Sequence, residues 1–226
     1  MKKKLIIFGC SSFLCTKIIK NLSKEYNVLG FSQKKIKNSK NVKYIKTDYD
    51  IQNILFNLKK EIKKNEKPIL IFFNAVAETK AFINLNQSEI KNFIKINLTL
   101  PMLLSNIVIK NFFYQKPNFI YFSSSRAFYG DVGISVYSAT KIALVNFARC
   151  LSLEYGKYDL NFKVILLGLV KGGLVNKLSK KKINEILNRS KIPKFIKIKE
   201  IIKILKSTID KKTSEKIIIK CDNGYR

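Results

Sequence analysis

Residues 119–141 read FIYFSSSRAFYGDVGISVYSATK and contain one complete β–α unit. The run 119–122 is short and apolar, which is typical of a strand buried on both faces of a sheet. Three serines follow it directly, and a helical pattern extends over residues 136–155. An apolar strand, a polar turn and a helix form the repeating element of a parallel sheet covered by helices.

The same alternation continues along the whole chain. Further apolar runs predict strands at residues 4–8, 27–31, 42–46, 69–73, 162–167 and 216–220. Helical spacing predicts helices over residues 11–22, 51–64, 89–113 and 198–209, with an interruption of the third at Pro101. Residues 171–197 are expected to be irregular. We predict one α/β domain over residues 1–226, a doubly wound parallel sheet with helices on both faces.

The N-terminus permits two interpretations. Three lysines followed by the apolar residues 5–15 resemble a secretion signal, and residues 5–8 followed by Gly9 resemble a first strand. The strand–helix alternation downstream favours the strand. No later apolar run reaches the roughly 18 residues that cross a bilayer, so we expect no membrane segment.

The composition excludes several kinds of site. The chain has no histidine, which excludes a Ser-His-Asp triad and any histidine-ligated metal, and we expect no metal site. The formal net charge is +29, but only four of the 44 basic residues are arginine and the lysines are spread along the chain. Such a lysine-rich composition is typical of an A- and T-rich genome. We find no arginine or aromatic cluster for specific nucleic-acid binding, whereas an acidic protein partner stays possible.

The cysteines indicate a compartment. Cys10, Cys15, Cys150 and Cys221 form no Cys-x-x-Cys pair, so neither a structural disulfide nor a zinc site is expected. Free thiols in a reducing, cytoplasmic environment are the prediction.

The turn after the first strand resembles a phosphate-binding loop that lacks some of its glycines. Gly9 fits the tight turn of a dinucleotide fingerprint, and the hydroxyls of Ser11 and Ser12 could donate to a phosphate at the start of the helix. The other glycine positions hold Ser12 or Phe13, and Cys15. An ordinary turn, with Phe13 and Leu14 packing the helix, is the alternative interpretation.

The residues after the second strand bear on cofactor choice. An NAD-selective site usually places an acidic residue there for the ribose 2′-hydroxyl, and this chain has none. Ser32 with Lys34 suits a 2′-phosphate and favours NADP(H) over NAD(H). In a chain this rich in lysine, the same residues can also be without significance.

Tyr137 and Lys141 lie four residues apart at the start of a predicted helix, so their side chains share one face. A phenol titrates near pH 10, and a nearby ammonium favours its ionised form. Tyr137 is then a candidate general acid/base for a carbonyl/alcohol pair. Taken alone, the pair is also compatible with an ordinary surface position.

Further residues stand in a recognisable order. Asn97 lies in the long third helix, Ser124 follows the fifth strand and precedes Tyr137 by 13 residues, and Lys141 comes last. This order resembles the Asn-Ser-Tyr-Lys tetrad of the classical short-chain dehydrogenase/reductase family. Other likenesses are Asn74-Ala75 after the fourth strand, Asp48 after the third, Leu167-Gly168 after the sixth and the terminal Asp222-Asn223-Gly224.

The resemblance implies a Rossmann-like fold and a role for each residue. Tyr137 is implied as general acid/base, Lys141 as the group that lowers its pKa, Ser124 as the group that polarises the substrate carbonyl, and Asn97 as the support of a water-linked proton path. The implied cofactor site comprises Gly9, Ser11, Ser12, Phe13, Leu14, Ser32, Lys34, Asp48, Asn74, Ala75, Tyr137, Lys141, Gly168 and Val170. A shifted alignment would instead make Ser123 or Ser125 catalytic; we expect Ser123 to pack beneath the site and Ser125 to face solvent.

The family implies an NAD(P)(H)-dependent oxidoreductase that interconverts a carbonyl and a secondary alcohol. A 3-oxoacyl-[acyl-carrier-protein] reductase and a reductase of sugar precursors or secondary metabolites are the substrate classes considered. A homodimer or homotetramer formed through the two long helices is implied as well. Phe13, Cys15 and Gly172, which stands where the family often has threonine, depart from the pattern. A non-catalytic binding or scaffold protein with an eroded cofactor loop is therefore the alternative.

Overall fold

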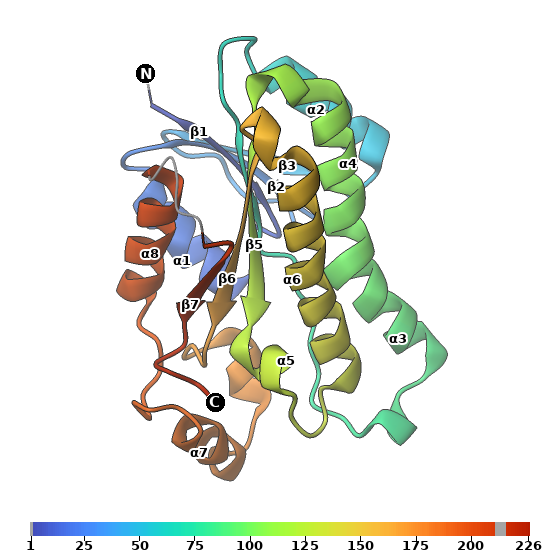
Figure 1. Cartoon of the computed structure of the whole chain (residues 1–226), viewed down its shortest axis with the longest axis vertical. Helices are drawn as coiled ribbons and strands as arrows, with labels where there is room; N and C mark the ends of the chain where they lie inside the picture. The colour runs from blue at the N-terminus through green and yellow to red at the C-terminus, as the bar shows by residue number, and fades with distance from the viewer. Residues whose placement is uncertain (1, 211–215) are drawn as a thin grey trace.

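The protein folds around one seven-stranded parallel sheet, seen in a computed structural model that describes residues 2–210 and 216–226, without the side chains of residues 174 and 177 (Figure 1). The strand order is β3-β2-β1-β4-β5-β6-β7. The strands are β1 (Lys4–Phe8), β2 (Asn27–Ser32), β3 (Val42–Lys46), β4 (Ile69–Phe72), β5 (Asn118–Ser124), β6 (Asn161–Leu167) and β7 (Ile218–Cys221). The predicted doubly wound α/β fold is confirmed, and the N-terminal apolar run is the interior strand β1, which lies between β2 and β4.

Helices cover both faces of the sheet (Figure 1). The α-helices are α1 (Phe13–Leu22), α2 (Ile51–Glu61), α3 (Gln87–Ile94), α4 (Leu100–Phe112), α5 (Ser125–Tyr129), α6 (Ser135–Tyr155), α7 (Lys180–Asn188) and α8 (Ile198–Asp210). Short turns of helix are η1 (Phe82–Asn84), η2 (Lys95–Thr99), η3 (Phe113–Gln115), η4 (Gly156–Tyr158) and η5 (Gly173–Lys177). α1 and α8 pack on one face, and α2, α4 and α6 pack on the other.

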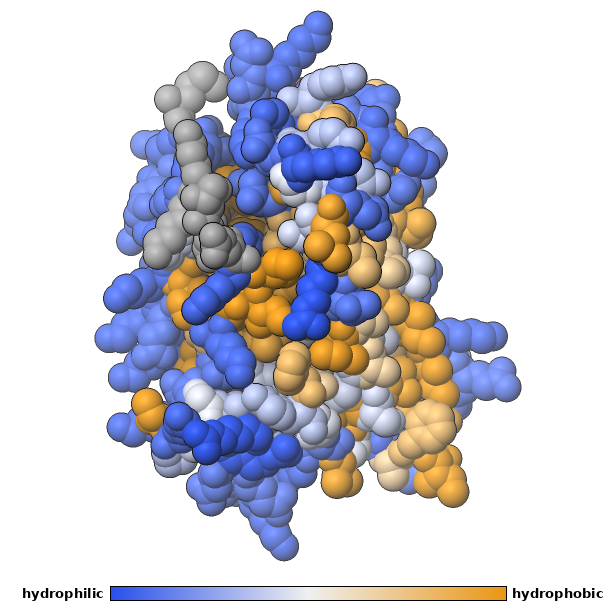
Figure 2. Space-filling view, viewed as in Figure 1, coloured by the Kyte–Doolittle hydropathy of each residue, from blue (hydrophilic) through white to orange (hydrophobic). Residues whose placement is uncertain are grey.

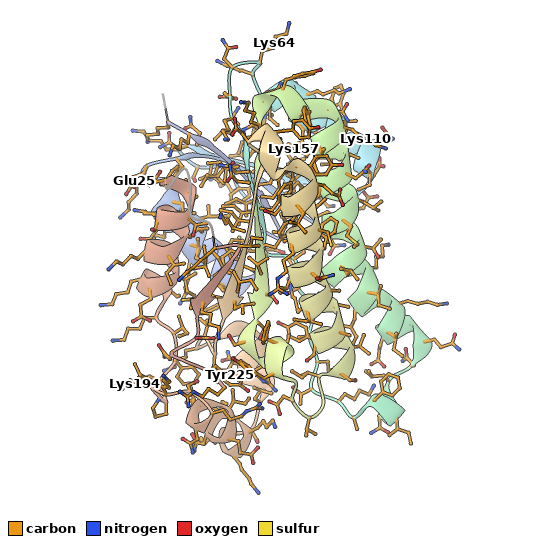
Figure 3. The ribbon with its side chains drawn as sticks, in the orientation of Figure 1. Glu25, Lys64, Lys110, Lys157, Lys194 and Tyr225 are labelled. Carbon is orange, nitrogen blue, oxygen red and sulfur yellow. The ribbon has the colours of Figure 1, made fainter. Side chains whose placement is uncertain are left out.

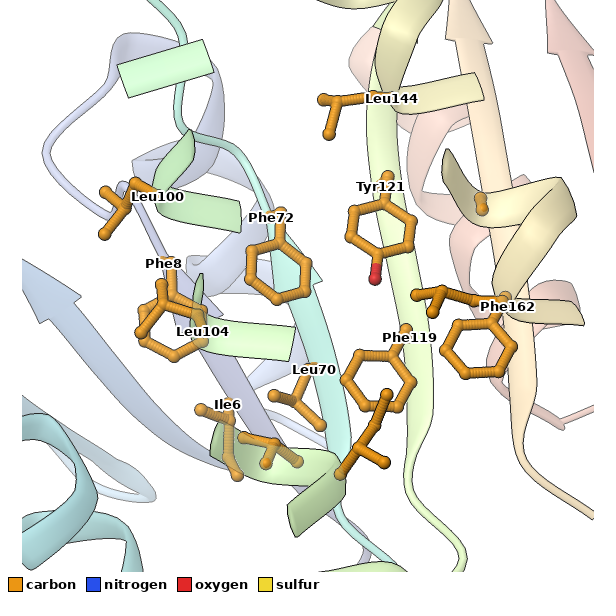
Figure 4. Packing of buried hydrophobic residues seen from close by; sticks show 14 of the residues in the cluster. Ile6, Phe8, Leu70, Phe72, Leu100, Leu104, Phe119, Tyr121, Leu144 and Phe162 are labelled. Atoms are coloured by element: carbon orange, nitrogen blue, oxygen red, sulfur yellow. The ribbon is translucent and has the colours of Figure 1, made fainter. Parts of the chain in front are cut away.

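Aromatic rings fill the core beneath α4 and α6 (Figure 4). The parallel register pairs Phe8 with Phe31 and with Phe72, and Phe72 with Tyr121. Partners in register point to the same face, so the rings stack, with centroids 5.1, 5.2 and 4.9 Å apart. The Tyr121 hydroxyl, which would be costly to bury alone, lies 2.7 Å from the Ser105 hydroxyl.

Pro101 does not interrupt the long third helix, contrary to the prediction. α3, η2 and α4 follow one another directly, and η2 is a π-helical turn in which the Leu100 N–H bonds to the Lys95 carbonyl. Pro101 then falls in the first turn of α4, where proline needs no N–H partner. A π-helical turn in mid-helix often marks a functional site, and Asn97 lies within this one.

The stretch Gln87–Gln115 is long and apolar enough to cross a membrane by length and composition alone. Here it covers the sheet, and Leu104, Val108 and Phe112 are buried in the core beneath it. The core helix of a soluble protein satisfies the same criteria, which makes this weak evidence for a membrane span.

Residues 171–197 are more ordered than predicted. Ser179 caps α7 by accepting a hydrogen bond from the Lys182 N–H at 3.2 Å. Ile186 of α7 is buried with Leu169 and Tyr225 in a small core of their own. α7 therefore closes the end of the molecule at which the strands terminate (Figure 1).

On the face seen in Figure 2, hydrophilic residues surround a hydrophobic area, and an apolar groove runs along the edge strand β7. The groove has a volume of about 610 Å³ and includes Phe128, Leu166, Ile204 and Ile218. Lysines lie at both ends of the molecule, with Lys194 near α7 and Lys64 and Lys157 at the opposite end (Figure 3). The positive charge is thus distributed, as the composition suggested.

Candidate active site

The carboxyl ends of the parallel strands meet at one edge of the sheet, where a cavity of about 390 Å³ opens. Nine of the predicted site residues line it: Ser12, Phe13, Leu14, Ala75, Ser124, Tyr137, Lys141, Gly168 and Val170. The other predicted residues lie outside its lining: Gly9, Ser11, Ser32, Lys34, Asp48, Asn74 and Asn97. The structure therefore brings together most of the predicted catalytic residues and the first-turn residues 12–14.

Ser124 and Tyr137 form a hydroxyl pair in this cavity. Ser124 ends β5, and Tyr137 lies in the first turn of α6. Burial raises the pKa of Tyr137, while a hydrogen bond with Ser124 and the charge of Arg126 act to lower it. The phenol is therefore protonated at neutral pH and ready to donate.

Lys141 lies one turn further along α6, also lines the cavity and is 2% exposed. Its ammonium donates to the carbonyl oxygens of Asn74 and Phe122 at 3.1 and 3.0 Å. Burial lowers the pKa of Lys141 to about 8 because the charged form loses its hydration. The positive charge that lowers the pKa of Tyr137 is that of Arg126, whereas the sequence led us to expect that of Lys141.

Asn97 supports the site from outside the cavity. Its amide bonds to both backbone groups of Val76, accepting from the N–H at 2.8 Å and donating to the carbonyl at 2.9 Å. It also donates to the Thr140 hydroxyl at 3.2 Å. Asn97 thereby joins the loop after β4 to α6, next to Lys141. Its expected water-linked path stays a prediction.

The three consecutive serines have three different environments. Ser123 donates to the Lys141 carbonyl at 2.9 Å and packs beneath the site, as expected. Ser125 is fully buried and donates to Asp222 at 2.6 Å, so the expectation that it faces solvent is wrong. Strand β7 brings Asp222 there, and that contact spans 97 residues, which no local pattern reveals. Among the three, Ser124 is the one that bonds to Tyr137.

The first turn keeps features that suit a dinucleotide. Gly9 has a φ of +83°, and a Cβ there would lie 2.8 Å from the Asn74 nitrogen, so only glycine fits. Ser12 caps α1 by accepting from the Cys15 N–H at 3.2 Å. The side-chain oxygen of Asn74 is buried and has no hydrogen-bond partner among the described residues. The exact fit at Gly9, the capped helix start and this free acceptor are compatible with a bound dinucleotide.

Phe13 does not pack the helix, contrary to the prediction. Its side chain is 42% exposed, and Lys17 lies over its ring at 4.2 Å. The ring rests on Gly172, where a Cβ would meet it at 2.3 Å. Gly172 has a φ of +102° and follows β6, so the ring connects the first turn to the loop after the sixth strand. The two departures from the family pattern, at residues 13 and 172, are thus one contact.

The residues predicted after β2 and β3 stabilise their own turns. The Ser32 hydroxyl accepts from the Lys34 N–H at 3.1 Å, and the Asp48 carboxylate accepts from the Asp50 N–H at 3.1 Å. Tyr49 was not predicted. Its hydroxyl accepts from the Asn74 amide at 3.0 Å, which connects the β3 turn to the β4 turn.

Gly168 is required by packing. A Cβ there would lie 2.8 Å from the Cα of Asp222, and its N–H bonds to the Cys221 carbonyl at 2.9 Å. Val170 forms an isolated parallel bridge with Ile196. Both residues line the cavity, as predicted.

Sequence analysis missed an ionic cluster at the cavity edge. Asp131 forms ion pairs with Arg126, Lys182 and Arg189 at 2.8, 3.0 and 3.9 Å. Two of the chain's four arginines meet here. This scarcity was a signal that could have singled them out.

The short chain dehydrogenase family profile matches residues 6–183. The chain belongs to this family. It is 30% identical over 217 residues to the 3-oxoacyl-[acyl-carrier-protein] reductase of Buchnera aphidicola subsp. Baizongia pistaciae, covering 90% of this chain and 88% of that protein. It is 28% identical over 149 residues to the Bos taurus reductase of the same name, covering 65% and 59%.

Solved structures show the same fold. A 4-hydroxyisoleucine dehydrogenase complexed with NADH superposes with a TM-score of 0.87 at 21% identity, covering 99% of this chain and 98% of that one. ElxO with NADP bound gives a TM-score of 0.86 at 15% identity, covering 100% and 99%. The protein is therefore an oxidoreductase of the short-chain family with a Rossmann NAD(P)-binding fold, in preference to the non-catalytic alternative.

Proposed function

We propose that this protein reduces a ketone carbonyl to a secondary alcohol, with Tyr137 as the general acid. The observation that supports this most directly is that the hydroxyls of Ser124 and Tyr137 interact in a cavity that the buried Lys141 also lines. A carbonyl oxygen that accepts from both hydroxyls replaces the bond between them. Because burial keeps the phenol protonated, the free enzyme is in the form that reduction requires.

The cofactor site of this proposal is formed by Gly9, Ser12 and Asn74 with the residues around them. When bound, NAD(P)H supplies the hydride. Tyr137 gives its proton to the oxygen that becomes the alcohol, and Ser124 holds that oxygen in place. Lys141, with a pKa of about 8, can exchange a proton close to neutral pH, and Asn97 keeps the loop after β4 against α6.

NADP(H) is proposed over NAD(H). No acidic residue follows β2, and Lys34 is exposed beside Ser32, whose hydroxyl already accepts from the Lys34 backbone. A 2′-phosphate would meet cations there and no repelling carboxylate.

A 3-oxoacyl group is the first substrate to test, because the curated relatives are named for it. An acidic carrier protein suits the lysines that begin α7, at the end of the molecule that holds the cavity. We also propose a homodimer or homotetramer through α4 and α6, whose outer faces expose Leu103, Ile142 and Leu153. Free cysteines agree with a reducing, cytoplasmic location.

The test measures NADPH and NADH oxidation by the full chain with a 3-oxoacyl thioester and a panel of simple ketones. Tyr137→Phe should lower kcat by about 10²–10⁴-fold, because the phenolic proton is lost while the ring remains. Tyr114→Phe is the matched control, since Tyr114 is 93% exposed and remote from the cavity. NADPH should have the lower KM. Equal turnover by Tyr137→Phe and wild type would reject the assigned role.

A further inference from the structure

Arg126 stands in the candidate site without a part in the chemistry proposed so far. It lies in α5, two residues after Ser124, and lines the cavity with Ser124 and Tyr137. Its side chain is only 12% exposed. Its charge lowers the pKa of Tyr137, which places the guanidinium within electrostatic range of the reacting group. A substrate bound against Tyr137 must therefore interact with this charge.

Asp131 holds Arg126 in place. The Arg126 Nε donates to Oδ2 of Asp131 at 3.0 Å, and Nη2 lies 2.8 Å from the same oxygen. Burial acts to raise the pKa of Asp131, but hydrogen bonds from Lys182 and Arg126 outweigh it and lower the pKa. Asp131 is thus ionised at neutral pH and fixes the orientation of the guanidinium.

The cluster has more positive than negative charge. Lys182 lies 3.0 Å from Oδ1 of Asp131, and Arg189 lies 3.9 Å from the same oxygen. Glu185 lies 3.6 Å from Lys182, so two carboxylates face three cations, and Asp131, shared by all three, cannot neutralise Arg126 completely. Burying a surplus charge is costly unless an opposite charge joins it. The surplus indicates that an anion completes the cluster.

The geometry of Arg126 indicates the kind of anion. A guanidinium has five N–H donors, and Asp131 occupies the Nε–Nη2 edge through a single oxygen. Within residues 2–210 and 216–226, Nη2 is buried and makes no hydrogen bond of good geometry. The edge formed by Nη1 and Nη2 has the fork that binds one carboxylate through two parallel bonds. A phosphate would need further donors, and Lys141 is already bonded to two carbonyls.

We propose that Arg126 binds a carboxylate of the substrate and that the preferred substrate is an oxo acid. The proposal rests on the carbonyl reduction proposed above. It replaces the acyl thioester, named there as the first substrate to test, with a free oxo acid. In this arrangement Arg126 positions the substrate, while Ser124 and Tyr137 act on its ketone oxygen.

The test compares acetoacetate with methyl acetoacetate, in which one methyl group removes the negative charge. Wild type should reduce the acid with the higher kcat/KM. Arg126→Gln should raise KM for the acid by about 10–100-fold, because hydrogen bonds to charged groups contribute about 1.5–3 kcal/mol. KM for the ester should stay within about twofold of wild type, whereas kcat should fall to a similar extent for both substrates, because the charge that lowers the pKa of Tyr137 is lost. Arg126→Lys should recover only part of the preference, since lysine keeps the charge without the fork.

Arg189→Gln is the matched control, because Arg189 contacts the same carboxylate but does not line the cavity. Asp131 keeps two cations in either variant, so both should fold. The control should retain the wild-type preference for the acid. The proposal is overturned if wild type prefers the ester, if Arg126→Gln raises KM equally for both substrates, or if Arg189→Gln raises KM for the acid as much as Arg126→Gln does.

A binding measurement separates this proposal from the proposed reductase activity. Butyrate has the carboxylate but no ketone, and with NADPH present it should raise the Tm of wild type and Arg189→Gln but not of Arg126→Gln. If neither keto compound nor the 3-oxoacyl thioester is reduced, the proposed activity fails. The carboxylate site is then tested by the change in Tm with butyrate alone. A wild-type Tm that butyrate does not raise refutes the site.

Discussion

The first turn, residues 9–15, and the catalytic edge, formed by Ser124 and Tyr137, differ in how much of the family pattern they keep. After β1, Gly9 remains but Phe13 and Cys15 stand at glycine positions of the fingerprint, and Phe13 rests on Gly172. At the end of β5, Ser124 and Tyr137 form a bonded pair. Phosphate binding relies on backbone N–H groups, which every residue except proline has, provided that the backbone can approach the phosphate. Proton transfer relies on one hydroxyl, and no neighbour replaces it.

The largest expected effect tests whether the catalytic edge acts as one unit. Ser124→Ala should lower kcat by about 10³-fold, because the substrate oxygen loses the hydroxyl that holds it. The effects of residues that act together on kcat are not additive. The double variant Ser124→Ala/Tyr137→Phe should therefore have a kcat only slightly below that of Tyr137→Phe alone. Steady-state kinetics of the three variants give the answer.

The first turn supplies the control for that experiment. Ser12→Ala removes a helix cap and one hydroxyl of the proposed cofactor site, so it should change the cofactor KM by a few fold and leave kcat nearly unaltered. If Ser12→Ala lowers kcat as much as Ser124→Ala does, the contrast between the two regions is wrong.

The next effect concerns the cost of burying Lys141. Its folded pKa is about 8, below the usual 10.5, so the folded state binds fewer protons than the unfolded state between these values. Stability should therefore rise from pH 8 to pH 10.5, by up to about 3 kcal/mol at about 1.4 kcal/mol per pKa unit. Below pH 8 the amine is charged in both states and its contribution is constant.

Lys141→Met isolates this term. The variant leaves the carbonyls of Asn74 and Phe122 without their donor, which shifts stability equally at every pH. Urea unfolding of both proteins at pH 7.5 and pH 10 should show a wild-type gain that the variant lacks. The surface lysines cancel in the difference. If both proteins gain the same free energy of unfolding between pH 7.5 and pH 10, burial does not lower the pKa of Lys141.

The smallest effect tests whether Phe13 and Gly172 form one contact. Gly172→Ala should destabilise the protein by about 2 kcal/mol, because the positive φ is strained and the Cβ meets the ring. In a Phe13→Ala background the cost should fall to about 1 kcal/mol, leaving strain alone. Denaturant unfolding of the four proteins completes this double-mutant cycle.

Gly130→Ala provides the reference for strain without collision. Gly130 has a φ of +76° with no atom within 4 Å of an added Cβ. Its substitution should cost the same in the presence and absence of Phe13. If Gly172→Ala also lowers the free energy of unfolding by the same amount with and without Phe13, the ring can move away from residue 172 without cost.

Local patterns predicted the strands and the catalytic edge because both depend on neighbours in sequence. The buried run 119–122 and the spacing of Tyr137 and Lys141 needed no distant partner. Ser125, in contrast, is buried by Asp222, which is 97 residues away. The direction of Phe13 depends on Gly172, and the role of Arg126 depends on Asp131 and on α7. Such contacts are fixed by the topology of the sheet, which a linear pattern does not contain.

The contact between Phe13 and Gly172 also restricts which substitutions this loop accepts. With the ring in its present position, residue 172 has no room for any side chain, threonine included. A larger residue at 172 therefore requires either a new position for the ring or a smaller residue at 13.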